Sequence, residues 1–241
     1  MKRIIDILFS IIGLVISSPI IIPVIFLIWV YDKKNPFYIA KRVGKNGKAF
    51  NMVKLRSMAI DSDKSGVDST SSNDSRITPI GGFVRSYKLD EISQLWNVLL
   101  GDMSLVGPRP NVKIETDIYT SIEKKILLTK PGITDLASIV FSDEGTILKD
   151  EIDPNIAYNQ LIRPWKSRLA LIYIEHSSIA LDISIIFYTV ISFVSKPIAT
   201  RWVSRKLEKI GADKKLINVS LRLEELVPFP PPGSNKVVTS R

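Results

Sequence analysis

The sequence of 241 residues contains no cysteine and a single histidine, His176. The lack of cysteine excludes disulfide bonds, zinc sites built on thiolates and a cysteine nucleophile. The lone histidine lies in the segment IYIEHSS, where a surface or packing role is favoured over a serine–histidine triad. Glycine-rich phosphate loops of the GxGxxG and Walker types are also absent. Any phosphate chemistry must therefore use other groups.

Acidic residues are fewer than basic ones. The chain has 33 lysines and arginines against 24 aspartates and glutamates, which gives a net charge of +9. Nucleic acid, anionic lipid or a phosphorylated substrate could each explain this excess. Basic patches with interleaved aromatic residues are not evident, so nothing beyond charge favours a nucleic-acid binder, and we expect no nucleic-acid partner.

A long apolar run predicts a membrane element over residues 1–33. The 24 residues from Ile7 to Val30 carry no charge, and roughly 20 apolar residues are enough to cross a bilayer. A secretory signal peptide would have a shorter apolar core and a small-residue cleavage site. Trp29 and Tyr31 fit the aromatic belt of a membrane interface.

Ser18 and Pro19 interrupt this run near its middle. A proline inside a helix removes a backbone hydrogen bond, and serine hydroxyls can bond the freed carbonyl groups. Basic residues flank both ends, whereas a crossing segment normally has its positive bias on one side. The residues alone leave two alternatives: a hairpin that bends at Ser18-Pro19 and returns to the same face, and a kinked transmembrane anchor.

The rest of the chain predicts a small α+β domain, mostly helical with short strands, over residues 34–200. Two strands are expected within 37–60 and another over 133–141. Helices are expected over residues 88–100, 111–129 and 164–174.

Three further segments have distinctive composition. The Ser/Asp-rich stretch 61–76 is interpreted as a solvated linker, with a substrate lid as the alternative. Residues 181–194 are apolar but too short to cross a bilayer, so we expect them in the core or as an amphipathic helix in the membrane interface. Residues 201–241 are predicted to form a basic, partly disordered tail.

Two adjacent acids, Asp90 and Glu91, are the catalytic candidates. They lie on the predicted helix 88–100, with Gln94 on the same face as Asp90. Adjacent acids are common on solvated helix faces and also complement the helix dipole, so the pair alone is weak evidence.

Basic residues strengthen the case. Arg85 precedes the acids, and Arg109 stands between two prolines that stiffen an extended backbone. Carboxylates that can hold a metal, beside guanidinium groups, suit a site that binds phosphate. The candidate substrate-binding residues are Lys54, Arg56, Arg85, Gln94, Pro108, Arg109 and Pro110.

These residues resemble the bacterial sugar transferases, the monotopic phosphoglycosyl transferase family. The resemblance covers roughly residues 1–195. It includes KRIIDILFS with the Ser18-Pro19 break, RVGKNGKAFNMVKLRSM, the long block DSRITPIGGFVRSYKLDEISQLWNVLLGDMSLVGPRP, then KPGIT and ALDISIIFYTV.

The resemblance implies transfer of a sugar 1-phosphate from a UDP-sugar to undecaprenyl phosphate, with release of UMP and a requirement for Mg²⁺. It implies that Asp90 is the nucleophile, forms a covalent phosphosugar intermediate and holds the metal. Glu91 would handle a proton, and Lys54, Arg85 and Arg109 would bind phosphates or position the acids.

The resemblance also favours the re-entrant hairpin and places the catalytic domain on the cytoplasmic face of the bacterial inner membrane. A homodimer is a further expectation. One departure stands out: Asp135 and Ser138 replace the usual glycine and glutamine of GITG-x-AQ, and IVFSDE follows instead of an NGR-like stretch. The alternative is an inactive membrane-tethered scaffold for glycan assembly. The sugar and the glycan stay open.

Overall fold

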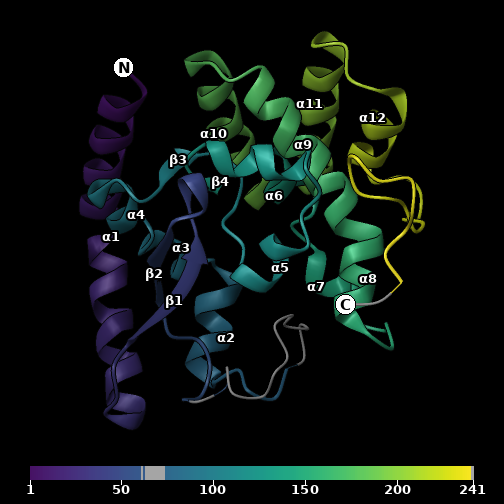
Figure 1. Ribbon diagram of the computed structural model, residues 1–241. Coiled ribbons are helices and arrows are strands. Elements are labelled where there is room, and N and C mark those ends of the chain that lie inside the picture. The colour runs from purple at the N-terminus through teal and green to yellow at the C-terminus, as the bar shows by residue number, and fades with distance from the viewer. Residues whose placement is uncertain (61, 63–73, 240–241) are drawn as a thin grey trace.

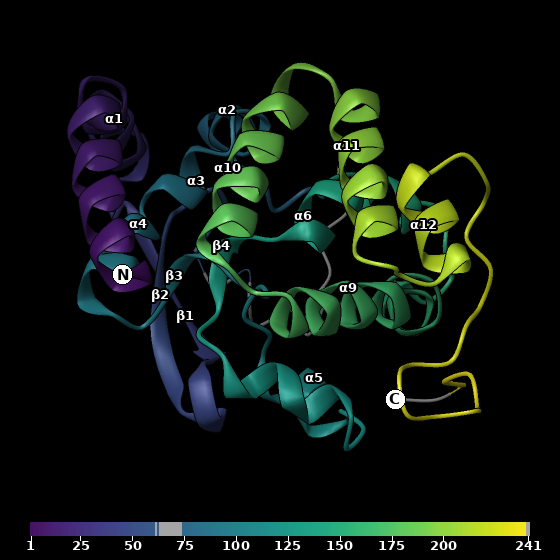
Figure 2. The same cartoon turned by 90° about the horizontal axis from the view of Figure 1, so that it is seen from above.

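A computed structural model describes residues 1–60, 62 and 74–239 (Figure 1). Helix α1 (Lys2–Asp32) lies along one side of a mostly helical α+β body (Figures 1 and 2). Strands β1 (Phe37–Val43) and β2 (Ala49–Leu55) form the expected antiparallel hairpin. Strands β3 (Ser104–Val106) and β4 (Gly132–Thr134) form a second, parallel pair.

Short helices fill the middle of the chain, and longer ones follow residue 163. They are α2 (Pro79–Ser86), α3 (Leu89–Ile92), α4 (Leu95–Leu100), α5 (Lys113–Asp117), α6 (Leu136–Val140), α7 (Glu144–Ile147), α8 (Pro154–Ala157), α9 (Arg163–Glu175), α10 (Ile179–Val194), α11 (Lys196–Lys209) and α12 (Lys214–Leu221), with 3-10 turns η1 (Lys45–Gly47) and η3 (Glu123–Leu128) and the π-helix η4 (Tyr158–Ile162). Most of the segment 61–76, interpreted above as a linker or a lid, lies outside the described residues.

Helix α1 is continuous over 31 residues, with two prolines inside it. Pro19 cannot bond the carbonyl of Val15, and Ser18 Oγ donates to that oxygen at 2.7 Å, as the sequence predicted. The hairpin itself is not shown, because the two ends of α1 lie at opposite ends of the body in Figure 1. Among the described residues it is the one helix long and apolar enough to cross a membrane.

The body holds both ends of α1. Lys2 Nζ lies 2.5 Å from the Asp182 carboxylate on α10, and Asp32 Oδ1 accepts a hydrogen bond from Arg56 Nη2 at 2.7 Å just after β2. Between them, Val24 and Ile28 pack in a small buried cluster with residues of β2, α2 and α3. The opposite face of α1 exposes large apolar side chains: Ile4, Leu8, Ile12, Val15, Ile16, Ile20, Phe26 and Leu27.

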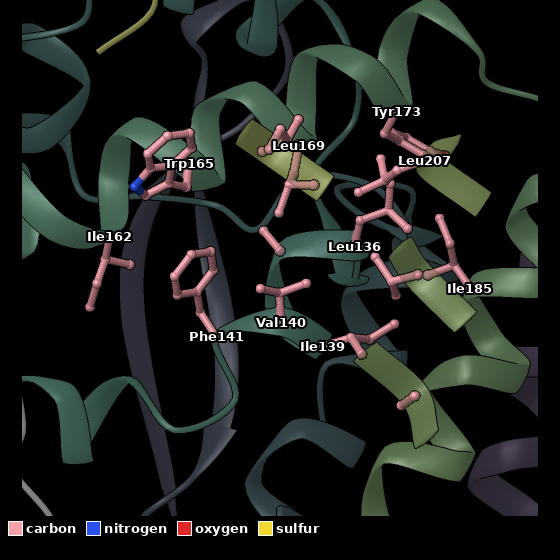
Figure 3. Close-up of a cluster of buried hydrophobic side chains, with 14 of the residues drawn as sticks. Leu136, Ile139, Val140, Phe141, Ile162, Trp165, Leu169, Tyr173, Ile185 and Leu207 are labelled. Atoms are coloured by element: carbon pink, nitrogen blue, oxygen red, sulfur yellow. The ribbon is translucent and has the colours of Figure 1, made fainter. Parts of the chain in front are cut away.

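The main core lies in the C-terminal half, around α9. Trp165, Leu169 and Tyr173 are buried there against α6, α10 and α11 (Figure 3). Residues 181–194, expected in the core or the interface, form most of α10: Leu181 and Ile185 are buried, whereas Phe187, Val190 and Phe193 are exposed. One side of helix α10 therefore packs in the core, and its other side is an exposed apolar face.

Two predicted elements are divided in the structure. The helix expected over 88–100 is split into α3 and α4 at Ser93 and Gln94, and Ser93 Oγ lies within hydrogen-bonding distance of the carbonyl oxygens of Asp90 (2.9 Å) and Val53 (3.1 Å). The strand expected over 133–141 stops at Thr134. There Asp135 starts α6 with a capping box: its carboxylate accepts from Ser138 N at 2.6 Å.

The segment expected to be helical over 111–129 holds only the short α5 and η3. The tail also differs from expectation, because residues 201–239 pack on the core. Val203, Leu207 and Leu216 of α11 and α12 are buried, since apolar residues recur at helical spacing among the basic ones. Phe229 then stacks on Trp165 with ring centroids 4.4 Å apart.

Candidate active site

A cleft of about 890 Å³ opens between the β1–β2 hairpin, α2, the segment after Arg109, and the elements α7, η4 and α9. Its volume lies within the range of small-molecule sites. Eight basic side chains line it (Lys41, Arg42, Lys54, Arg56, Arg76, Arg85, Arg109 and Lys166), against three acidic ones (Asp90, Glu115 and Glu144). This excess of positive charge favours an anionic ligand.

Asp90 reaches the cleft because of the way α3 begins. Lys88, in a left-handed conformation (φ 51°), turns the chain into α3, and Leu89 is buried against the cluster that also contacts α1. Lys54 Nζ on β2 lies 3.8 Å from Asp90 Oδ2. Burial raises the pKa of Asp90 above its ordinary value, and the Lys54 charge offsets only part of that shift.

Glu91 faces a different cation. Its Oε2 lies 3.2 Å from Arg109 Nη1, which also donates to the Ile133 carbonyl at 2.8 Å. Burial would raise the pKa of Glu91, but Arg109, Lys88 and Lys54 outweigh it and the pKa is lowered. Glu91 in turn raises the pKa of Arg109. Both members of this pair are therefore held in their charged forms.

Two glycines clamp the Arg109 segment to β4. Gly107 N donates to Thr134 O and Gly132 N donates to Pro108 O, each at 3.0 Å. A Cβ on Gly132 would lie 2.1 Å from Gly107 N, so only glycine permits this approach. The two motifs GPRP and PGIT, separate in sequence, therefore form one unit that positions Arg109.

The remaining predicted residues differ in whether they line the cleft and in whether they are already bonded to another group. Arg85 and Pro110 line the cleft, and Arg85 has no ion-pair partner within the described part of the chain. Arg56 also lines the cleft, but its guanidinium is bonded to Asp32.

Pro108 and Gln94 stand apart from the cleft lining. Pro108 acts through its carbonyl, in the clamp described above. Gln94 is fully buried, and neither of its amide atoms has a partner among the described residues.

Sequence reasoning missed part of the cleft wall. Lys41 and Arg42 belong to the basic residues that follow the apolar run, and they line the cleft from β1. Glu144, Tyr158 and Lys166 also line it, from α7, η4 and α9. The sequence carries no signal for these three, because the loops that bring them to Asp90 have no fixed spacing.

The donor set for Mg²⁺ is small. The described residues contain no group of three His, Asp or Glu side chains that could hold a metal. Mg²⁺ is often bound by one or two carboxylates together with substrate phosphates and water. Asp90, in a cleft that suits phosphates, fits that mode, whereas a site made of protein groups alone does not fit.

Comparison with known proteins gives a consistent picture. The family model described as "Bacterial sugar transferase" matches residues 1–196. A Klebsiella pneumoniae protein named UDP-glucose:undecaprenyl-phosphate glucose-1-phosphate transferase is 35% identical over 199 residues, which are 81% of this chain and 40% of that protein. The Aeromonas hydrophila UDP-N-acetylgalactosamine-undecaprenyl-phosphate N-acetylgalactosaminephosphotransferase is 31% identical over 78% of this chain and 42% of its own length.

A third relative is more similar over a shorter stretch. A Bacillus subtilis protein, provisionally named an undecaprenyl-phosphate N-acetylgalactosaminyl 1-phosphate transferase, is 46% identical over 118 residues. These are 49% of this chain and 66% of that protein. The chain thus spans from 40 to 66% of the length of these three relatives.

Proposed function

Since this chain belongs to the bacterial sugar transferases, a family of polyprenyl-phosphate sugar-1-phosphate transferases, we propose that it moves a sugar 1-phosphate from a UDP-sugar to undecaprenyl phosphate. The observation that carries the proposal is the carboxylate of Asp90, set beside Lys54 in a cleft with eight basic side chains. The names of the Klebsiella and Aeromonas relatives support the donor and acceptor classes.

In the first step, an Asp90 carboxylate oxygen attacks the phosphorus that bears the sugar. A bond forms between that oxygen and phosphorus, the bond to the bridging oxygen breaks, and UMP leaves with the electron pair. Attack by an anion on an anionic phosphate meets repulsion, which the nearby cations Lys54, Arg85 and Arg109 reduce. The covalent intermediate lets donor and acceptor use the cleft in turn.

In the second step, a phosphate oxygen of undecaprenyl phosphate attacks the same phosphorus. The bond to Asp90 breaks, its electron pair returns to the carboxylate, and the polyprenyl-diphosphate sugar leaves. The acceptor phosphate is already anionic, so this step needs no proton removal. The ion pair with Arg109 and the lowered pKa of Glu91 support a positioning role for Glu91 rather than the proton transfer expected above.

Mg²⁺ belongs to the proposal as well. Asp90 would hold it together with the donor phosphates, and the bound ion would supply charge neutralisation of the diphosphate. The cleft contains two carboxylates besides that of Asp90, on Glu115 and Glu144.

The contacts of α1 support a placement on one face of the membrane. A helix whose two ends are both bonded to one polar body cannot put those ends on opposite sides of a bilayer. We propose that both ends of α1 lie on the cytoplasmic face of the inner membrane, and that this helix, continuous in the structure, would bend at Ser18-Pro19 when it is in lipid. The exposed apolar faces of α1 and α10 would then contact lipid.

The test uses Asp90→Asn, with Asp150→Asn as a control at an exposed acid. We expect Asp90→Asn to abolish UMP release from UDP-sugar panels with Mg²⁺ and polyprenyl phosphate, and to remove the adduct that mass spectrometry finds on the peptide containing residue 90. Because Asp90 is the partner of Lys54, a thermal melt of the variant checks that it still folds.

Wild-type turnover by Asp90→Asn, or an adduct on another peptide, would contradict the mechanism. A wild-type chain that releases no UMP from any donor would favour the alternative, a membrane-tethered scaffold. The intact acids and arginines in the cleft speak against that alternative.

A further inference from the structure

The cleft has a second wall whose chemistry differs from the side that holds Asp90. On the Asp90 side stand Lys54 and Arg85. The second wall is made by Glu144, Tyr158 and Lys166 from α7, η4 and α9. In Figure 2, helix α9 lies between the β1–β2 hairpin and α12.

The charges of the second wall cancel within it. Lys166 Nζ forms an ion pair with the Glu144 carboxylate, and the same ammonium lies 5.2 Å from the centre of the Tyr158 ring. The side chains of Lys166 and Glu144 are 23% and 35% exposed, so a ligand can reach both. The wall therefore presents a carboxylate and an ammonium beside a mostly buried aromatic ring, without net charge.

Such a wall suits a polyhydroxylated neutral group better than a phosphate. Carboxylate oxygens accept hydrogen bonds from hydroxyl groups, and the ammonium donates to hydroxyl or amide oxygens. The hydroxyl of Tyr158, protonated at neutral pH like that of an ordinary tyrosine, is a further donor in the wall. Phosphates are better placed against Arg85, which makes no close ion pair with a carboxylate of the described residues.

We propose that Glu144, Lys166 and Tyr158 form the subsite for the sugar of the donor, with Glu144 accepting hydrogen bonds from its hydroxyl groups. This inference rests on the proposed function. In a UDP-sugar the sugar is bonded to the phosphorus that Asp90 attacks, so it must occupy the same cleft as Asp90. The relatives' names differ in the sugar and share the carrier lipid. A transferase of this family therefore needs a surface of its own that recognises the sugar.

Direct binding tests the subsite without turnover. Calorimetry on the full chain carrying Asp90→Asn would compare UDP with UDP-glucose, UDP-galactose, UDP-N-acetylglucosamine and UDP-N-acetylgalactosamine. The measured quantity is the affinity of each UDP-sugar relative to UDP. Glu144→Gln is the main variant, and the double variant Glu144→Gln/Lys166→Met removes both charges if a single change unfolds the protein. Glu151→Gln, at an exposed glutamate outside the cleft, is the matched control.

We expect Glu144→Gln to lower the advantage of the best UDP-sugar over UDP about tenfold, with the affinity for UDP changed by less than about twofold. Tyr158→Phe should act in the same direction, and Glu151→Gln should change neither value. In transfer assays with Asp90 intact, Glu144→Gln should reduce the ratio of kcat/KM between the best donor and its C4 epimer.

Three results would overturn the subsite: weaker UDP binding with the sugar advantage intact, which assigns the wall to the nucleotide; no change in either affinity; or no UDP-sugar that binds more tightly than UDP. The proposed function fails separately. If no donor yields UMP while the binding results hold, the transfer is wrong and the sugar subsite stands.

Discussion

At the scale of single residues, the pairing of Lys54 with Asp90 sets the charge state of the carboxylate that we propose as the nucleophile. The proposed attack needs an ionised Asp90; burial raises the pKa of Asp90, and Lys54 at 3.8 Å works against that rise. Burial also lowers the pKa of Lys54, so each group depends on the other to stay charged. Glu91 differs, because three cations hold its pKa below the ordinary value.

The first residue-scale prediction concerns pH. Lys54→Met should raise the pKa of Asp90 further, so less of the carboxylate is ionised at a given acidic pH and the acid limb of kcat/KM moves upward by about 1 unit or more. Lys54→Arg keeps the charge and should leave the limb nearly in place. A pH profile of UMP release checks both, and an unchanged limb in Lys54→Met would show that Lys54 does not act on Asp90.

At the scale of elements, the clamp between the GPRP segment and β4 holds Arg109 in reach of Glu91. It depends on backbone contact at Gly107 and Gly132, where no side chain fits. The interruption of the 88–100 helix belongs to the same scale. Ser93 Oγ ties α3 to β2 and thereby fixes Asp90 beside Lys54.

Gly132→Ala tests the clamp. Its added methyl group would overlap the Gly107 backbone, and forcing these strands apart should cost about 1–3 kcal/mol of unfolding free energy and reduce turnover. Gly82→Ala is the matched control: it lies in α2 with open space around its Cβ position, so stability should hold or rise. Thermal melts and UMP release measure both, and equal melting temperatures for the two variants would contradict the clamp.

At the scale of the whole molecule, the two bonded ends of α1 support the proposed placement on one face of a membrane. Lys2 reaches α10 and Asp32 reaches the end of β2, so the body extends along the whole helix. The outward faces of α1 and α10 stay apolar and uncovered within the described part of the chain. In the proposed placement these two apolar faces would contact lipid, whereas the cleft is lined largely by charged groups.

Because the chain has no cysteine, its topology is open to site-directed labelling. We expect a cysteine placed in a tag before Met1, Lys34→Cys and the body control Glu151→Cys to react with an impermeant maleimide only after cells are opened. Labelling of the tag alone in intact cells would mean that α1 crosses the membrane, and the single-face placement would be wrong.

The sequence by itself determined the features that depend on neighbours along the chain. The apolar run of α1, the hydroxyl of Ser18 beside Pro19, the β1–β2 hairpin and the acids of α3 could all be predicted, because spacing and composition act over a few residues. The same holds for the family, whose motifs are contiguous stretches. The tail is more ordered than its basic composition predicted, because apolar residues recur at helical spacing among the basic residues of α11.

Only the tertiary structure decided which distant groups meet. Lys54 and Asp90 are joined by the packing of β2 on α3, Arg109 and Glu91 by the glycine clamp, and Lys166 and Glu144 by the approach of α9 to α7. The sequence placed Gln94 on the face of Asp90, yet Gln94 is fully buried and does not line the cleft. The physical reason is that side-chain distances across loops follow from how whole elements pack, which no local pattern records.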